Sequence, residues 1–169
     1  HFRKEPFCSV LSEVTLPERD PLEFLEAATR FAGEKLWGTL SAVLIAPHAL
    51  LSDPSLSAAC ESAVERLDYG VVSVNAWSGL AFGMGELPWG AAPGSTLADV
   101  RSGIGWAHNA FMLEGVQKVV LRAPLAAFPT PFWYPRHRSL RRFARAFLDY
   151  EFDPGPLKLA KLGGAALSG

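Results

Sequence analysis

The chain has 169 residues, and its 16 Lys and Arg nearly balance 17 Asp and Glu for a formal net charge of -1. With 49% hydrophobic residues it has the composition of a folded globular domain, which excludes a disordered chain. The balanced charge argues against a dedicated nucleic-acid binder, and no apolar run reaches the roughly 18 to 20 residues that span a bilayer. Two cysteines and no apolar leader favour a soluble, cytoplasmic protein.

The first residues predict a strand followed by a helix. Cys8–Leu16 alternates apolar and polar residues, as a half-buried strand does. Asp20 is a good N-cap and Pro21 suits the first helical position. Apolar residues then recur at helical spacing until Gly33, a residue typical of helix ends.

The next elements predict a mostly parallel sheet. Ser41–Ala46 is a short apolar run typical of a strand covered on both faces. Asp53-Pro54 repeats the cap signal and begins a helix that extends towards Gly70, and Val71–Val74 is a further β-branched run. This alternation of strands and helices predicts right-handed crossovers in a doubly wound α/β layer.

The second half begins with a glycine- and proline-rich segment, 75–94, which predicts a loop ordered by its own aromatic residues. Thr96 is expected to cap a short helix through Arg101, and Val116–Leu121 predicts a late strand. The proline-rich stretch 124–135 reads as a connector, and Leu140–Tyr150 predicts a final helix.

Common catalytic and metal-binding patterns do not occur in this sequence. The histidines are too far apart to predict a metal site, and we expect them to be structural or exposed: His1, His48, His108 and His137. Cys60 falls on the apolar side of a predicted helix, where burial would raise its pKa. Cys8 has no neighbouring base, so neither thiol is predicted to be a nucleophile.

One strongly charged cluster occurs, the basic run Arg136–Arg145 at the start of the final helix. Such a run can hold a phosphate or an acidic lipid head group at a membrane surface. A solvated helix face explains it as well, and this is the interpretation that the sequence favours.

Five segments, taken in order, resemble the later half of the catalytic region of aldehyde dehydrogenases. Glu5–Leu11 resembles the Glu-Ile-Phe-Gly-Pro-Val segment of that family. The others are similar to its Ala-Asn-Asp-x-x-Tyr-Gly-Leu-x-Ala turn, its Leu-x-x-Gly-x-Val-x-Val-Asn strand, its Pro-Phe-Gly-Gly segment and its Ser-Gly-x-Gly segment: Ala32–Ala42, Leu67–Asn75, Pro88–Gly90 and Ser102–Gly105. The resemblance extends over residues 5–122.

The resemblance implies that this chain is the C-terminal part of an aldehyde dehydrogenase-like oxidoreductase. Residues 1–115 would form part of its catalytic α/β domain, 116–122 an oligomerisation strand, and 123–169 a connector with a helical extension. In this family a cysteine thiolate attacks an aldehyde, hydride passes to NAD or NADP, and a thioester is hydrolysed. The resemblance puts the nucleophile, the general base and the dinucleotide-binding domain before His1, so this chain is expected to hold no catalytic residue and to be inactive alone.

The resemblance also implies binding residues. Glu5 would accept hydrogen bonds from the nicotinamide ribose, and Phe7 would pack beside the nicotinamide ring. The loop after Asn75 would line the access route of the aldehyde. Its apolar residues are the candidate substrate contacts, although core packing would explain them nearly as well: Trp77, Leu80, Phe82 and Trp89.

Two further expectations concern partners. The strand Val116–Leu121 resembles a family strand that extends the sheet of a neighbouring subunit, which implies a homo-oligomer. The alternative to the whole family interpretation is a non-catalytic α/β module that binds an anionic or protein partner through its basic C-terminal helix.

Overall fold

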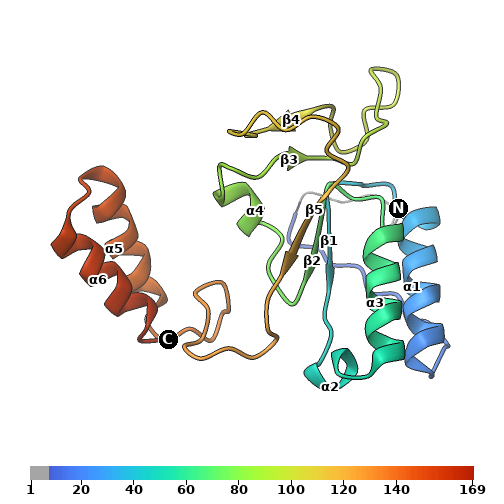
Figure 1. Cartoon of the computed structure of the whole chain (residues 1–169), viewed down its shortest axis with the longest axis horizontal. Helices are drawn as coiled ribbons and strands as arrows, with labels where there is room; N and C mark the ends of the chain where they lie inside the picture. The colour runs from blue at the N-terminus through green and yellow to red at the C-terminus, as the bar shows by residue number, and fades with distance from the viewer. Residues whose placement is uncertain (1–7) are drawn as a thin grey trace. The chain divides into compact units, whose positions relative to one another are not determined.

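A computed structural model describes residues 8–169 in two compact units, one ending at Leu125 and the other comprising Ala126–Gly169 (Figure 1). The first unit contains α1 (Pro21–Lys35), β1 (Ser41–Leu44), α2 (His48–Leu51), α3 (Pro54–Arg66), β2 (Val71–Val74), α4 (Leu80–Gly83), β3 (Trp89–Gly90), β4 (Trp106–Ala107) and β5 (Val119–Arg122). The second contains α5 (Leu140–Phe152) and α6 (Pro156–Ala166). Among residues 8–169, no helix has the length and apolar character needed to cross a bilayer.

The first unit is an α/β fold built on a three-stranded parallel sheet of order β1-β2-β5. Ser41 pairs with Val71, and Val71 pairs in turn with Val119, so the three strands start level with one another. The predicted α/β class and parallel pairing are confirmed. A separate two-stranded antiparallel ribbon joins β3 to β4.

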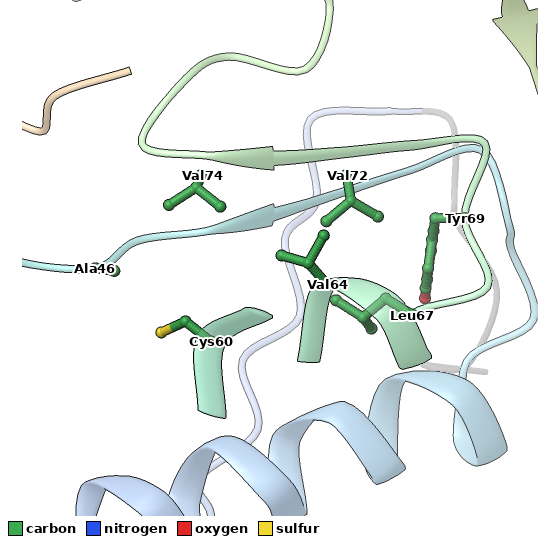
Figure 2. Packing of buried hydrophobic residues seen from close by; sticks show 7 residues of the cluster. All are labelled: Ala46, Cys60, Val64, Leu67, Tyr69, Val72 and Val74. Atoms are coloured by element: carbon green, nitrogen blue, oxygen red, sulfur yellow. The ribbon is translucent and has the colours of Figure 1, made fainter. Parts of the chain in front are cut away.

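Helices α1 and α3 cover one face of the sheet. Figure 2 shows Val72 and Val74 of β2 pointing towards Cys60 and Val64 of α3. All residues of this buried cluster are aliphatic except a tyrosine and a thiol: Ala46, Cys60, Val64, Leu67, Tyr69, Val72 and Val74. Partly buried Leu25 of α1 packs against the cluster, so both helices share one apolar layer.

The opposite face of the sheet is covered by α4 and the segment that follows it. Val71 and Val119 point to this side and pack with Ala81 of α4. Partly buried Leu87 and Trp89 complete this smaller cluster. The sheet is therefore buried on both sides at β2, whose residues are all buried.

The N-caps predicted for α1 and α3 are both present. The Asp20 carboxylate accepts hydrogen bonds from the N–H groups of Leu22 and Glu23, at 2.9 and 3.2 Å. Asp53 caps α3 in the same way. These caps form as predicted because they depend on residues within one turn of chain.

Three predicted boundaries are wrong by a few residues. Helix α1 continues past Gly33 to Lys35, and Gly33 does not adopt the left-handed backbone of a glycine that ends a helix. Helix α3 ends at Arg66 rather than near Gly70, and the Leu67 N–H bonds to the Ala63 carbonyl. Helix α5 starts at Leu140 as predicted and ends at Phe152.

The predicted strand Cys8–Leu16 is wrong. This segment has no regular structure from Cys8 onward and no strand pairs with it, and the side chain of Leu11 is 94% exposed. Its alternation is real, but without a partner strand the pattern alone cannot satisfy backbone hydrogen bonds.

The expected burial of Ser41–Ala46 on both faces is also wrong. β1 is an edge strand, with Val43 46% and Ile45 66% exposed. The apolar residues of this run therefore line a surface that the described residues leave uncovered. A groove of about 610 Å³ lies there, lined among others by Phe24, Leu25 and Leu56.

The short helix predicted from Thr96 to Arg101 is absent. Thr96 and Asp99 instead close a turn by exchanging backbone hydrogen bonds of 3.0 and 3.1 Å, and the Thr96 hydroxyl accepts a further one. Thr96 forms the predicted capping hydrogen bond, but no helix follows this turn. Helices α2, α4 and α6 and the β3–β4 ribbon were not predicted.

Lys118 caps the C-terminus of α3. Its ammonium donates to the carbonyls of Val64, Glu65 and Leu67 at 3.0, 2.7 and 2.6 Å. A cation at a helix C-terminus satisfies carbonyls that the helix leaves without partners and complements the helix dipole. Because Lys118 precedes β5 directly, this contact also holds β5 beside β2.

Candidate functional site

The short motifs that carry the family resemblance meet where β1 and β2 begin. Thr39 lies two residues before the start of β1. Its carbonyl accepts hydrogen bonds from the Gly70 N–H at 2.9 Å and from the Ala92 N–H at 3.0 Å. Gly70 leads into β2, and Ala92 follows β3. One carbonyl thus joins three segments that are far apart in sequence.

Two glycines let these segments approach closely. A β-carbon on Gly70 would overlap the carbonyl of Gly90, and a β-carbon on Gly90 would overlap the carbonyl of Gly105. Neither glycine has a left-handed backbone, so the requirement is for space and not for conformation.

The segment Ser102–Gly105 is joined to Thr39 through a side chain. The Ser102 hydroxyl accepts a hydrogen bond of 2.8 Å from the N–H of Thr39. We call this group of five residues the glycine junction: Thr39, Gly70, Gly90, Ser102 and Gly105. The junction fixes the position of the β3–β4 ribbon relative to the sheet.

The candidate substrate residues are only partly brought together. Phe82 lies edge-on to Trp89, with 5.7 Å between ring centroids. Phe82 also lies edge-on to His108 at 5.0 Å, so the imidazole extends this aromatic cluster. His108 was predicted only as a structural or surface residue, and its left-handed backbone, φ 68°, turns the chain after β4.

The other two candidates lie apart from that cluster. Trp77 is exposed, and its ring lies against the α-carbon of Gly79 at the start of α4. Leu80 is half-buried in α4. The four candidates therefore form an aromatic pair and two flanking side chains, all on the α4–β3 side of the sheet.

At the carboxyl ends of β1 and β2, Asn75 ties the two strands together. Its side-chain amide accepts from the Ala46 N–H and donates to the Ala46 carbonyl, both at 2.8 Å. The backbone of Asn75 is left-handed, φ 58°, a conformation that asparagine tolerates better than most residues. The asparagine in the matched Leu67–Asn75 segment therefore has a physical role in this fold.

A polar cavity of about 280 Å³ lies beside the glycine junction and contains two cations among its lining residues, Arg101 and Lys118. Arg101 is paired with Asp99 at 3.0 Å, and the ammonium of Lys118 is used by the three carbonyls that end α3. Burial lowers the pKa of Lys118, against the opposing effect of Asp68 and Glu65. Both cations are thus engaged by the protein itself.

The two thiols differ in environment. Cys60 is buried in the core, where burial and then the charge of Glu61 raise the pKa of its thiol, as predicted. Cys8 is exposed. A buried, protonated thiol is a poor nucleophile, so Cys60 acts as a small apolar side chain.

The predicted cofactor contacts, Glu5 and Phe7, lie outside the described residues. Within residues 8–169, no group of three or more potential metal ligands is found. His48 is exposed on α2, and His137 is buried in the second unit.

Comparison of this chain with family models, with curated proteins and with solved structures finds no match.

Proposed function

We propose that this chain forms the C-terminal part of an NAD- or NADP-dependent aldehyde dehydrogenase-like oxidoreductase. The enzyme would oxidise an aldehyde to an acid through a thioester on a cysteine that precedes His1. The bound dinucleotide would supply the hydride acceptor. The chain would contribute one layer of the catalytic domain and a wall of the substrate site.

The glycine junction is the observation that carries this proposal. The resemblance rests on short segments, each of little weight alone, that are matched in order along the sequence. Four of them supply residues to one set of backbone contacts: Thr39, Gly70, Gly90 and Ser102. If the four segments must fit together in space, small residues are needed in each of them. A chance similarity of separate segments would not explain why these residues meet in the fold.

The open face of β1 gives independent support. Within residues 8–169, β1 is an edge strand, and the exposed side chains of Val43 and Ile45 line an apolar groove of about 610 Å³ beside it. An exposed apolar edge of this kind is normally covered by further protein. This is the surface expected of a layer that belongs to a larger catalytic domain.

In this proposal the aromatic pair Phe82 and Trp89 forms the apolar wall that holds the aldehyde, with Trp77 and Leu80 beside it. Apolar side chains suit this role because they bind the hydrocarbon part of an aldehyde and exclude water. Glu5 and Phe7 remain the proposed contacts to the nicotinamide ribose and ring.

The proposed oligomer would form at β5. This strand, Val119–Arg122, pairs with β2 of its own chain and starts three residues later than the expected Val116–Leu121, while its extension of a neighbouring sheet stays a proposal. Within the described residues no strand covers its other edge, which is the geometry needed for strand addition.

The proposal is tested by following aldehyde-dependent formation of NADH or NADPH with the full product of the gene. We expect turnover by that product and none by the 169-residue chain alone. Turnover by the isolated chain that Cys8→Ala abolishes would contradict the proposal.

Substitutions in the full product test the substrate wall. Trp89→Ala should raise KM for the aldehyde about 10- to 150-fold, because removing a packed aromatic ring loses roughly 1.5 to 3 kcal/mol of apolar contact. KM for the dinucleotide should not change. Phe111→Ala, at an exposed aromatic of the same unit, is the matched control and should leave both constants unchanged.

A further inference from the structure

The two units of the chain carry opposite charge. Residues 126–169 contain seven Lys and Arg against three Asp and Glu, a net charge of +4. Residues 1–125 contain nine against fourteen, a net charge of -5. The net charge of the whole chain is therefore near zero although the second unit is basic.

The second unit is a helical hairpin whose ends are tied together. Ser139 donates its hydroxyl to the Ser168 carbonyl at 3.1 Å, which joins the start of α5 to the residues after α6. His137 accepts the N–H of Ser139 at 3.2 Å, and its other ring nitrogen faces the Ala166 carbonyl at 3.4 Å. These contacts fix the two helices as one rigid pair.

Aromatic packing holds the other side of α5. Phe143 stacks on Phe132 with 4.6 Å between ring centroids, and Phe147 stacks on Phe143 at 6.2 Å. The aromatic side chains occupy one face of α5, so its arginines are left on the opposite face.

A cleft of about 610 Å³ opens on that opposite face. It is lined by three arginines in the first turns of α5 and one arginine just before this helix, by two lysines of α6, and by one carboxylate and two small residues. They are Arg138, Arg141, Arg142, Arg145, Lys158, Lys161, Asp149, Ser139 and Ala146. Six cations thus face one acid across the same space.

In residues 8–169, no acidic side chain forms an ion pair with these arginines. Within the described residues, none of the four guanidinium groups lies within 4.0 Å of a carboxylate, whereas Lys158 is paired with Asp153 at 2.8 Å. Like charges held at helical spacing destabilise the helix that carries them. A bound anion would remove this repulsion and would accept hydrogen bonds from several guanidinium forks.

We propose that this cleft is a binding site for a ligand with several phosphate groups. Arginine forks match the geometry of phosphate oxygens, and the cleft volume of about 610 Å³ exceeds what one small monovalent anion needs. The site is independent of the proposed oxidoreductase function, since all of its residues lie in the second unit.

The phosphates could belong to a soluble polyphosphate compound or to a lipid head group. The lipid source is suggested by two exposed apolar residues close in sequence to cleft residues, Phe152 and Leu157. Apolar side chains beside a basic cluster are typical of proteins that bind at a membrane surface. The experiment therefore has one arm for each source.

The first arm is calorimetric titration of the whole 169-residue chain with inorganic tripolyphosphate at low salt. The double variant Arg142→Gln/Arg145→Gln should bind at least about tenfold more weakly, since charge-assisted hydrogen bonds are lost. Arg142→Lys/Arg145→Lys keeps the charge but not the forks and should fall between the two. Glutamine and lysine both favour helix, so α5 should persist in circular dichroism.

The control is Arg30→Gln/Arg66→Gln, which removes the same charge from exposed positions on α1 and α3. It should bind tripolyphosphate within about twofold of the original chain, because neither arginine lines the cleft. Equal weakening by the control and the cleft variant would overturn the proposal, because the chain would then attract anions without a defined site.

The second arm is sedimentation with phosphatidylcholine vesicles that contain a phosphoinositide, compared with phosphatidylcholine alone. Phosphoinositide-dependent binding that the cleft variant loses, without tripolyphosphate binding, identifies a lipid source. Tripolyphosphate binding without vesicle binding identifies a soluble source. Binding in neither arm, or binding that the cleft variant retains, would overturn the proposal.

Discussion

Asn75 and Asp53 show how single side chains decide where elements of this fold begin and end. Asn75 joins two parallel strands through both polar atoms of its amide, at 2.8 Å each. Asp53 begins α3 by accepting the Ser55 and Leu56 N–H groups at 2.8 and 3.1 Å. The cap is local and was visible in the sequence, whereas the partner of Asn75 is 29 residues away and was not.

Asp53 gives a pH-dependent prediction. The hydroxyl of Ser55, followed by the Leu56 and Ser55 N–H groups, lowers the pKa of this carboxyl below its usual 3.8. A carboxyl with a lowered pKa in the folded state stabilises the fold above its usual pKa, and this contribution is lost as pH falls through the folded value. Asp53→Asn keeps a cap but cannot titrate.

The melting temperature of the original chain should therefore fall more steeply below pH 3.8 than that of Asp53→Asn. Ser55→Ala keeps the carboxylate and removes the strongest of its hydrogen bonds, so its acid transition should begin at higher pH than that of the original chain. A difference between the original chain and Asp53→Asn that stays constant from neutral pH into acid would refute this account.

Lys118 gives a prediction at neutral pH. Lys118→Met keeps the apolar stem but leaves the carbonyls of Val64, Glu65 and Leu67 without the ammonium. The free energy of unfolding should fall by about 2 kcal/mol in urea, given the usual value of hydrogen bonds to a charged group. Lys35→Met, at an exposed lysine on α1, is the control, and an equal loss there would show that the carbonyl contacts do not matter.

At the scale of elements, the parts that could be predicted are those set by nearby residues. β2 and β5 were recognised from β-branched runs, and α1 and α3 from their caps and apolar spacing. Cys8–Leu16 has a similar pattern but no partner strand, and pairing is a long-range property that alternation cannot supply. The two-residue strands β3 and β4 are too short to leave any pattern.

The candidate site has the same limits. Phe82 and Trp89 could be selected from the family resemblance and their apolar bulk, but the approach of His108 depends on a turn with positive φ at two non-glycine residues, His108 and Asn109. The arginine face of α5 follows from its spacing. The lysines that complete the cleft come from α6, an element whose packing the sequence did not reveal.

The glycine junction makes a prediction at this scale. Gly70→Ala would drive a methyl group into the Gly90 carbonyl, and displacement of backbone should cost about 3 kcal/mol of unfolding free energy. Gly83→Ala is the matched control, because nothing lies within 4 Å of its would-be β-carbon and helix α4 should gain up to about 1 kcal/mol. Similar urea midpoints for the two variants would mean that the β3–β4 ribbon is not held at the junction.

At the scale of the whole molecule, two units of opposite charge follow one another along the chain. The acidic first unit carries the parallel sheet, the glycine junction and the open apolar edge of β1. The basic second unit carries the arginine cleft. We propose separate tasks for them, a layer of a catalytic domain and a phosphate site, so abolishing phosphate binding should leave aldehyde oxidation by the full gene product intact.

In the function that we propose, Phe82 and Trp89 line a substrate site whose attacking sulfur belongs to a cysteine elsewhere in the gene product. The most direct test is to trap the acyl-enzyme during aldehyde oxidation by that full product and to locate the acylated cysteine by mass spectrometry. We predict a thioester on a cysteine that precedes His1. A thioester on Cys8 or Cys60 would contradict the claim.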